Sequence, residues 1–262
     1  MGQRSVGRLP PSKVASSDSS RLNIWRRRSE RARALATRYP ATRDVLEFYA
    51  ALAEWQEQAA ARVAVFQDLV GVFPSLLEFV IRNGPSTLAE AARGLHDRGA
   101  SVDAMLGEYW SASGAAGDLF EVSPALEFFA RAALQVYAAK LPDGFDCAWC
   151  AKPPLAGRLR PQAEGLAFDV ICSMCFRARP HPRTHCAGCS ETSEARLALF
   201  TTPEFPHLRL RACEACRGYL LAVDLSREPA AIPEVDELSG LPLDLWAQEH
   251  GYQKFQPNLA GV

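Results

Sequence analysis

The chain has 262 residues, of which 48% are hydrophobic and 23% are charged, so it can bury a core and is expected to form one or two domains. Its 29 lysine and arginine residues nearly balance 30 aspartate and glutamate residues, which leaves no overall positive excess for binding nucleic acid. No run of about 18 apolar residues occurs, which excludes a membrane-spanning helix, and residues 1–21 lack the apolar core of a secretory signal. We therefore expect a cytoplasmic protein whose thiols stay reduced.

Positive charge is concentrated at the start of the sequence. Residues 1–38 contain ten basic and two acidic side chains, a net charge of +8, and the rest of the chain is net −9. Residues 1–20 include a stretch rich in serine and proline, which predicts a disordered basic tail. The segment from Arg26 to Arg38 is expected to form a solvated basic surface, with a docking surface for an acidic partner as the alternative.

Helical spacing of apolar residues dominates residues 21–141, which we expect to form an α-helical domain. Between residues 42 and 70 the apolar side chains recur three or four positions apart, with one polar exception at Gln56. This pattern predicts a single long helix with one buried face.

Three further helices are expected along this region. Thr87, with Glu90 three residues later, has the form of a capping box and predicts a helix that starts there. Residues 102–113 predict a shorter helix. Ser123 followed by Pro124 predicts the start of another, because serine caps helices and proline suits the first helical position. Four or five amphipathic helices imply a bundle-like domain.

No motif in the helical region carries recognisable catalytic chemistry. It contains no nucleophile elbow, glycine-rich phosphate loop or HExxH zinc motif. Its one histidine, His96, is isolated near a helix end, where a surface or capping role is expected. Trp55 and Trp110 are expected to pack in the core, so the region is interpreted as a scaffold or a binding surface.

All eight cysteines of the chain occur between residues 147 and 216, in four Cys-x-x-Cys pairs. Two residues between paired thiols let a tight turn, here called a knuckle, direct both sulfurs to one point, and two facing knuckles complete a tetrahedral thiolate site. Eight ligands make two such sites, and neither keeps an open position for a substrate, which disfavours hydrolysis. Both zinc and iron accept four thiolates. The candidate ligands are Cys147, Cys150, Cys172, Cys175, Cys186, Cys189, Cys213 and Cys216.

The spacing of the knuckles favours two consecutive modules. The two pairs within residues 147–175 are separated by 21 residues and those within 186–216 by 23, but only ten residues separate the two blocks. Alternating apolar residues predict strands at 166–170 and 208–211, and a further strand is expected over 219–225. A knuckle, a strand and a second knuckle form the plan of rubredoxins and zinc ribbons. An interleaved pairing of the knuckles is the alternative.

These patterns predict an α+β protein in which a bundle-like helical domain precedes two small rubredoxin-like or zinc-ribbon β modules. A module of about 30 residues buries too little apolar surface to fold alone, so bound metal is expected to hold it together. The expected segments are a disordered basic tail (1–20), a helical domain (21–141), a first four-cysteine module (142–180), a second four-cysteine module (181–226) and a C-terminal tail with a short helix (227–262).

Other uses of the cysteines and other ligands are disfavoured. A thioredoxin-like redox motif uses one Cys-x-x-Cys pair beside a helix rather than four, and extracellular disulfides would need a secretory signal. His181 and His185 could each replace a thiolate, but eight cysteines already fill two sites. Residues 141–225 carry ten basic and nine acidic side chains, a poor footprint for phosphate binding, so nucleic acid is not an expected partner.

The order of a helical domain, four knuckles and a short acidic tail resembles the FdhE family of formate dehydrogenase accessory proteins. The specific features are the knuckle spacing, Arg183 three residues before Cys186, and Tyr219 three residues after Cys216. The closing stretch also matches, with Asp236-Glu237-Leu238, Asp244-Leu245-Trp246-Ala247, Glu249-His250-Gly251-Tyr252 and Pro257-Asn258-Leu259.

The resemblance implies a cytoplasmic, non-enzymatic protein that assists maturation of formate dehydrogenase by binding its catalytic subunit. It also implies iron in two rubredoxin-like sites with the eight cysteines as ligands; zinc is the alternative metal. A rubredoxin-like electron-transfer protein and a zinc-ribbon nucleic-acid-binding protein are the alternative functions. One departure from the family concerns the residue after the second cysteine of a knuckle, which is often glycine but here is Ala151, Phe176, Ser190 or Arg217.

Overall fold

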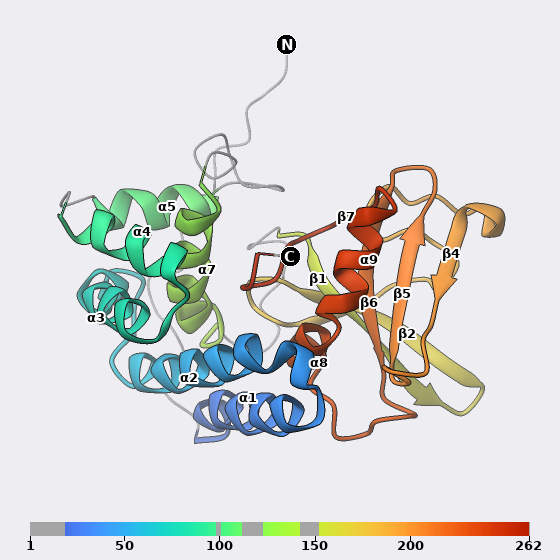
Figure 1. Cartoon of the computed structure of the whole chain (residues 1–262), viewed down its shortest axis with the longest axis horizontal. Helices are drawn as coiled ribbons and strands as arrows, with labels where there is room; N and C mark the ends of the chain where they lie inside the picture. Colours follow the sequence, from blue (N-terminus) through green and yellow to red (C-terminus); the bar gives the residue numbers. More distant parts are fainter. Residues whose placement is uncertain (1–18, 98–100, 112–122, 142–151, 262) are drawn as a thin grey trace, which may run out of the picture. The chain divides into compact units, whose positions relative to one another are not determined.

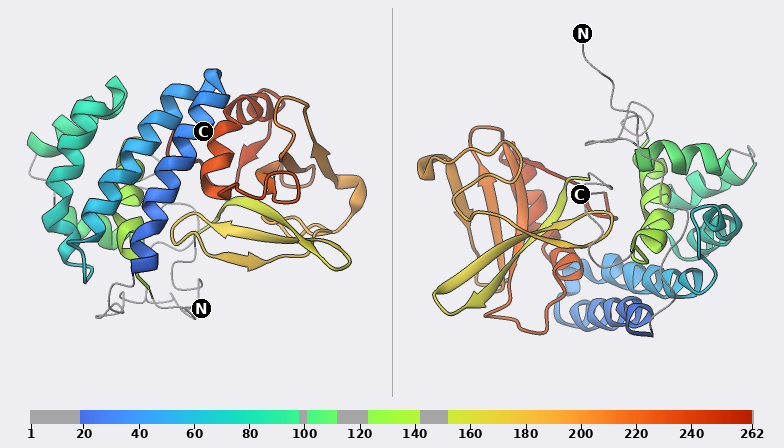
Figure 2. Two further views of the ribbon diagram at one scale, coloured as in Figure 1. Left: turned by 90° about the horizontal axis from the view of Figure 1, so that it is seen from below. Right: turned by 180° about the vertical axis from the view of Figure 1, so that it is seen from behind.

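The computed structural model describes residues 19–97, 101–111, 123–141 and 152–261. The chain divides into two compact units, whose ribbons are drawn in Figures 1 and 2. The helical unit comprises Met1–Ser29 and Ala51–Lys152, and the sheet unit comprises Glu30–Ala50 and Pro153–Val262. The tail expected over residues 1–20 lies, except for its last two residues, outside the described part of the chain. No described helix is both long and apolar enough to span a bilayer.

Helix α7 is the core element of the helical unit. Residues 128–138 of this helix are all buried, and helices α3, α4 and α5 contact it, so it is buried nearly all round rather than along one stripe. The side chains of Trp55 and Trp110 are buried, as predicted. The helices of the described residues are α1 (Ser19–Arg38), α2 (Arg43–Ala60), α3 (Asp68–Asn83), α4 (Ser86–Asp97), α5 (Val102–Ser111), α7 (Pro124–Ala138), α8 (Pro233–Ser239) and α9 (Leu241–Glu249).

The polar exception in the apolar face of α2 is explained by contacts with α7. Gln56 is fully buried, and its Nε2 donates to the Ala132 carbonyl oxygen at 3.0 Å and to Gln135 Oε1 at 3.2 Å. A buried amide costs stability unless it is hydrogen-bonded. Gln56 therefore joins α2 to α7 without interrupting the core.

The prediction of one helix over residues 42–70 is wrong, because the chain forms two helices there. Helix α2 ends at Ala60 and α3 begins at Asp68. In the turn between them the Asp68 carboxylate accepts hydrogen bonds from the backbone N–H groups of Ala64 and Val65, at 2.7 and 2.9 Å. The carboxylate thus satisfies backbone donors that a continuous helix would have satisfied internally.

Of the two helix starts predicted from capping residues, the one at α7 is confirmed and the one at α4 is wrong. Helix α4 begins at Ser86, so Thr87 lies inside its first turn and the predicted capping box is wrong. Ser123 caps α7 as predicted, since its Oγ accepts from the Leu126 N–H at 3.4 Å and Pro124 occupies the first helical position. Helix α5 confirms the helix expected from residue 102. His96 is exposed in the last turn of α4, in agreement with the expected surface role.

The sheet unit is built on seven strands that form one sheet, so the expected α+β class is confirmed. The strands run in the order β3-β2-β1-β6-β5-β4, and β7 pairs with β6. Strands β2, β5 and β6 confirm the three strands predicted from the sequence. The strands are β1 (Pro154–Gln162), β2 (Gly165–Cys172), β3 (Ala178–Pro180), β4 (Leu197–Phe200), β5 (Leu208–Cys213), β6 (Gly218–Asp224) and β7 (Gln253–Lys254), and two short 3-10 turns are η1 (Pro40–Thr42) and η3 (Glu194–Arg196).

Strand β1 joins the two expected modules into one sheet. It pairs antiparallel with β2 and parallel with β6, from Ala156 opposite Leu221 to Leu159 opposite Asp224. Strand β1 is not among the strands predicted from the sequence, because glycine, proline and two arginines interrupt its apolar pattern. The two ribbon-like regions consequently share hydrogen bonds and a core rather than folding as separate modules.

The two faces of the sheet carry different clusters of buried side chains. On one face Leu210, Tyr219 and Leu221 pack against α9 residues that include Ala247, and α8 contacts β1 and β6 (Figure 2). The cluster on the other face consists of Leu159, Phe168, Val170, Leu220 and Ala222, with Leu166, Ala187 and Phe255 packed against it. Residues 227–262, expected to hold one short helix, thus contain two helices and a strand.

A buried ionic network attaches β7 to α8 and α9. Lys254 Nζ donates to Glu237 Oε2 at 2.7 Å and to Asp244 Oδ2 at 2.8 Å, and all three side chains are at most 2% exposed. Burial raises the pKa of Glu237 to about 6 and also raises the pKa of Asp244. Burial alone would lower the pKa of Lys254, but the two carboxylates raise it. The three groups therefore depend on one another for charge compensation.

A second ion pair explains why residues 30–50 belong to the sheet unit. Arg31 Nε donates to Asp236 Oδ2 at 2.9 Å, and Asp236 is fully buried at the start of α8. The side chains of Arg38 and Glu228 pair at 3.0 Å. The Tyr39 ring packs on Phe205 with a centroid separation of 5.0 Å. The C-terminal half of α1 is thus attached to the sheet unit by both charge and packing.

Replacing Lys254 by methionine is expected to lower the free energy of unfolding by about 3–5 kcal/mol at pH 7, because two buried carboxylates lose their cation. Urea unfolding followed by circular dichroism measures this loss. The control is Arg82→Met, which removes the cation of an exposed pair with Glu78 and is expected to change stability little. Equal effects of the two substitutions would contradict the assigned role of Lys254.

Candidate metal centre

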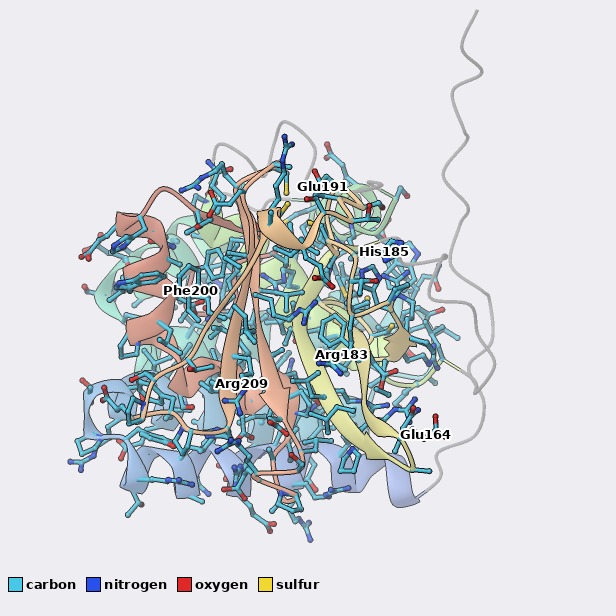
Figure 3. The ribbon with its side chains drawn as sticks, turned by 90° about the vertical axis from the view of Figure 1, so that its right-hand side faces the viewer. Glu164, Arg183, His185, Glu191, Phe200 and Arg209 are labelled. Carbon is cyan, nitrogen blue, oxygen red and sulfur yellow. The ribbon has the colours of Figure 1, made fainter. Side chains whose placement is uncertain are left out.

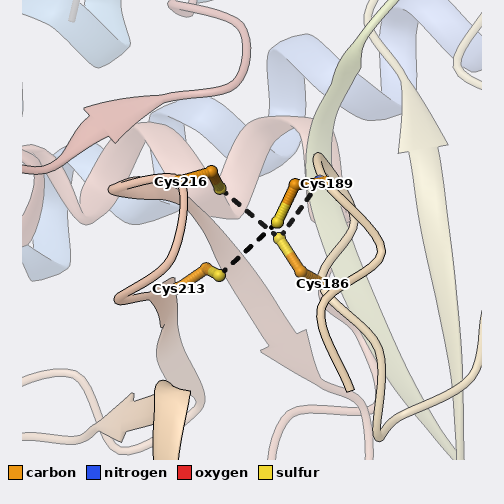
Figure 4. Close-up of side chains that lie close together, drawn as sticks. All are labelled: Cys186, Cys189, Cys213 and Cys216. Atoms are coloured by element: carbon orange, nitrogen blue, oxygen red, sulfur yellow. Dashed lines mark hydrogen bonds between the residues drawn. The ribbon is translucent and has the colours of Figure 1, made fainter. Parts of the chain in front are cut away.

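Four cysteine sulfurs converge in the sheet unit. The Sγ atoms of Cys186, Cys189, Cys213 and Cys216 all lie within 4.8 Å of one another (Figure 4). The Sγ atoms of Cys186 and Cys216 are 3.7 Å apart, as are those of Cys189 and Cys213. Four sulfurs at about 2.3 Å from a central ion would be separated by about 3.8 Å in a regular tetrahedron. The cluster therefore has the dimensions of a tetrathiolate metal site.

Two different local structures position these sulfurs. Cys186 and Cys189 lie in the loop between β3 and η3, whereas Cys213 is the last residue of β5 and Cys216 lies in the turn that leads into β6. The structure brings together the two knuckles within residues 186–216, which is the consecutive arrangement expected from their spacing. Cys186 and Cys213 are buried, while Cys189 and Cys216 are exposed.

Backbone N–H groups of the knuckles face the sulfurs. The N–H groups of Gly188 and Cys189 donate to Cys186 Sγ at 3.3 and 3.5 Å. A hydrogen bond from the Glu191 backbone lowers the pKa of Cys189. These donors favour the thiolate form that binds metal.

Without a cation, burial disfavours the thiolate form of two of the four cysteines. Partial burial and hydrogen bonding to Cys189 and Cys186 raise the pKa of Cys216 to about 12, and burial also raises the pKa of Cys186. A divalent ion at the centre of the four sulfurs would reverse this effect, since metal-bound thiols are deprotonated. The donor set therefore fits zinc or iron, which both accept four thiolates.

The structure places only half of the other predicted ligand set. Cys172 is the last residue of β2 and is fully buried, and Cys175 lies in the turn that follows. Cys147 and Cys150 lie outside the described residues, so the structure does not place a complete first site.

The knuckle at residues 172–175 repeats the backbone hydrogen bonds of the knuckle at 186–189. The Met174 N–H donates to Cys172 Sγ at 3.4 Å, as Gly188 does to Cys186 at 3.3 Å. The residue after the second cysteine donates its backbone N–H to the carbonyl oxygen of the first cysteine in both knuckles, Phe176 to Cys172 at 3.1 Å and Ser190 to Cys186 at 3.2 Å. The N–H of the first cysteine in turn donates to the carbonyl oxygen five residues later, Cys172 to Arg177 at 3.1 Å and Cys186 to Glu191 at 2.8 Å. The backbone around Cys172 thus has the form of a metal-binding knuckle.

A left-handed residue follows the second cysteine of each described knuckle. Phe176, Ser190 and Arg217 have φ angles of 55°, 62° and 57°, and no other described non-glycine residue has a positive φ. Glycine adopts this conformation at little cost, whereas a residue with a side chain is strained by about 1–2 kcal/mol. The residues that replace glycine in this sequence therefore stand at positions where the knuckle requires a left-handed backbone, which glycine adopts most easily.

Two glycines, Gly188 in the knuckle at 186–189 and Gly218 at the start of β6, are required by the side chain of Phe255. A Cβ atom built at Gly188 would lie 2.3 Å from Phe255 Cε1, and one built at Gly218 would lie 2.2 Å from the same atom. The ring therefore packs directly against both knuckles. The backbone N–H of Phe255 donates to the Tyr219 carbonyl at 3.0 Å, which fixes the ring beside β6. No pattern in the sequence predicts this contact, because Phe255 is distant in the chain from Gly188 and Gly218.

The two histidines near the knuckle lie outside the sulfur cluster. His181 is half-buried, and burial lowers its pKa. His185 is also half-buried and lies next to Cys186 on the loop that leads into the knuckle (Figure 3). Of the described histidines, aspartates and glutamates, none joins the four cysteines in the cluster.

Fold and site together define a class: an α+β protein with a cysteine cluster that can hold a metal ion in a sheet of zinc-ribbon-like form. Residues 184–260, which contain all four clustered cysteines, match the family model described as "FdhE, C-terminal domain". The resemblance to the FdhE family is therefore confirmed over this part of the chain.

Similar proteins carry the same family name. A protein named "Protein FdhE homolog" from Aquifex aeolicus is 32% identical over 98 residues, which are 37% of this chain and 34% of the relative. A protein of the same name from Stutzerimonas stutzeri is 30% identical over 165 residues, which are 57% of this chain and 53% of the relative. The chain thus spans about a third to a half of the length of these relatives. The crystal structure of the FdhE protein from Pseudomonas aeruginosa superposes with a TM-score of 0.68 at 23% identity, over 95% of this chain and 98% of that chain, which shows a shared fold.

Replacing Ser190 by glycine is expected to raise the free energy of unfolding by about 0.5–1 kcal/mol, because glycine removes left-handed strain but costs chain entropy. Thermal unfolding of the metal-loaded protein measures the change. Ser193, three residues later, has a φ of −70°, so Ser193→Gly is the matched control and is expected to lower stability. A loss of stability in Ser190→Gly would show that its backbone is not strained.

Proposed function

We propose that the chain is a cytoplasmic, non-enzymatic accessory factor that assists maturation of formate dehydrogenase by binding its catalytic subunit. The observation that carries this proposal is the match of residues 184–260 to the FdhE C-terminal domain. The fold shared with the FdhE protein from Pseudomonas aeruginosa supports it over a larger part of the chain.

A role without catalysis agrees with the chemistry of the cysteine cluster. Four thiolates around one ion leave no coordination position for a substrate or an activated water. The exposure of Cys189 and Cys216 places one side of such a centre at the protein surface, where it can contribute to a docking region. The metal would hold the two knuckles, and the surface around them, in one conformation.

We further propose that the chain holds two tetrathiolate sites. The first would use Cys147, Cys150, Cys172 and Cys175, and the second Cys186, Cys189, Cys213 and Cys216. The repeated backbone hydrogen bonds and the left-handed Phe176 support a ligand role for the knuckle at 172–175. Iron is the proposed metal by resemblance to the family, and zinc is the alternative, because both ions accept this donor set.

A rubredoxin-like electron-transfer protein is the second candidate function. It is favoured by the exposure of Cys189 and Cys216, since a redox centre must lie close to the surface to exchange electrons. This function requires iron and predicts a reversible one-electron couple in the purified protein. Zinc in the native protein would exclude it, because zinc has no redox chemistry.

Co-purification tests the proposed function. Affinity-tagged wild-type chain is expected to capture the catalytic subunit of formate dehydrogenase. The double variant Cys186→Ser/Cys213→Ser is expected to lose about nine-tenths of this capture, because removal of two ligands releases the metal and with it the arrangement of the knuckles. Capture is quantified by immunoblotting against the amount of tagged protein.

Ser190→Gly serves as the control, since it changes the same knuckle but keeps all four sulfurs. Failure of the wild-type chain to capture the subunit would contradict the proposed function. Undiminished capture by the cysteine variant would instead contradict the role of the metal centre in docking.

A further inference from the structure

A pocket lies beside the cysteine cluster, within the sheet unit. It has a volume of about 460 Å³, within the range of pockets that bind ligands. Cys186 and Cys213 line it on one side, and Leu220 and Phe255 line it from the sheet face opposite α9. Cys186 and Cys213 therefore belong both to the metal centre and to the lining of the pocket.

Two arginines give the pocket a positive charge. Arg211 on β5 places its guanidinium 4.4 Å from the ring centre of Phe168 and donates from Nη2 to the Arg183 carbonyl oxygen at 2.6 Å. Arg183 is exposed and lies on the loop that leads into the knuckle at 186–189 (Figure 3). Both arginines are among the residues that line the pocket.

Neither guanidinium forms an ion pair with any residue in the described part of the chain. Glu194 is the one acidic side chain among the described residues that line the pocket. Arg183 Nη1 donates to the Leu166 carbonyl oxygen at 3.5 Å. Two arginines that line one pocket and whose described contacts include no paired carboxylate form a site that can bind an anion.

Most of the remaining lining of the pocket is apolar, with Thr184, His185 and Glu194 as the polar exceptions. Leu197 and Leu199 of β4 line it together with Phe168, Leu220 and Phe255. Leu199 is 58% exposed, the largest exposed fraction among the large hydrophobic side chains of the described chain. Strand β4 is the last strand on the path of the sheet, and no described strand pairs with its outer edge. An uncharged edge strand is suited to bind an extended peptide through its backbone.

We propose that this pocket binds an extended segment of the formate dehydrogenase catalytic subunit in which a carboxylate is flanked by apolar side chains. This inference rests on the proposed function. The carboxylate of the segment lies between Arg183 and Arg211, and its apolar side chains contact Leu199 and Phe255. A peptide fits these features better than a nucleic acid, because two arginines in a mostly apolar pocket can neutralise only a few of the phosphates along a nucleic-acid strand.

Because Cys186 and Cys213 line the pocket, a metal bound to them would also help the pocket to recognise the peptide. Arg183 is three residues from Cys186, and Arg211 is two residues from Cys213. A metal ion that joins Cys186 to Cys213 therefore also fixes the separation of the two arginines. Loss of the metal is expected to disorder the anion site even though neither arginine is a ligand.

The test is the affinity of purified full-length chain for purified catalytic subunit, measured by biolayer interferometry. Arg183→Glu and Leu199→Asp are each expected to weaken binding about tenfold or more, because the first repels the carboxylate and the second places a charge on the apolar rim. Arg183→Lys keeps the charge and is expected to weaken binding less than Arg183→Glu. The matched control is Arg82→Glu, an exposed charge reversal on α3, which is expected to bind like wild type.

Metal content is measured for every variant, so that loss of the centre is not mistaken for loss of the pocket. Wild-type affinity in metal-loaded Arg183→Glu and Leu199→Asp would overturn the pocket proposal and leave the proposed function standing. Absence of binding by the wild-type chain would overturn both.

A photo-crosslinker placed at Leu199 gives a second readout. It is expected to attach to a segment of the catalytic subunit that contains aspartate or glutamate next to apolar residues. Attachment to a second copy of the chain, or to a segment without an acidic residue, would overturn the proposal.

Discussion

The convergence of four cysteine sulfurs within 4.8 Å is the constraint on which the second half of the sheet unit depends. The cluster joins the loop before η3 to the turn between β5 and β6, two segments that are far apart in the chain. Burial raises the pKa of Cys186 and of Cys216, and a cation at the centre of the cluster would stabilise the thiolate forms. A metal ion at this point would supply stability that the short strands alone cannot supply.

The C-terminal segment completes this arrangement by packing and by charge. The Phe255 ring occupies the space beside Gly188, in one knuckle, and Gly218, two residues after the other knuckle. The preceding residue, Lys254, is held by the buried carboxylates of Glu237 and Asp244. The position of the ring against the knuckles is thus coupled to the helices on the other face of the sheet. Both knuckles, Phe255 and Lys254 lie within residues 184–260, the part of the chain that matches the FdhE C-terminal family model.

Local features were predictable from the sequence, and long-range features were not. The Cys-x-x-Cys spacing, the Ser123 cap and the alternation in β2 and β5 depend on neighbouring residues, so each could be recognised directly. The break between α2 and α3 depends on one carboxylate, Asp68, which bonds backbone groups in place of the helix. The parallel pairing of β1 with β6 and the contact of Phe255 with both knuckles join distant segments, and no local pattern marks them. The departure from glycine after the second cysteine marked these positions in the sequence, but only the structure shows that a phenylalanine, a serine and an arginine adopt a glycine-like backbone there.

X-ray absorption spectroscopy at the iron and zinc edges, combined with the metal-to-protein ratio, tests the central claim most directly. The protein is purified under reducing conditions without added metal. Two metal ions per chain are expected, each surrounded by four sulfurs at about 2.3 Å. One ion per chain would contradict the proposed first site, and nitrogen or oxygen ligands in the coordination shell would contradict the assignment of eight cysteines as the ligands.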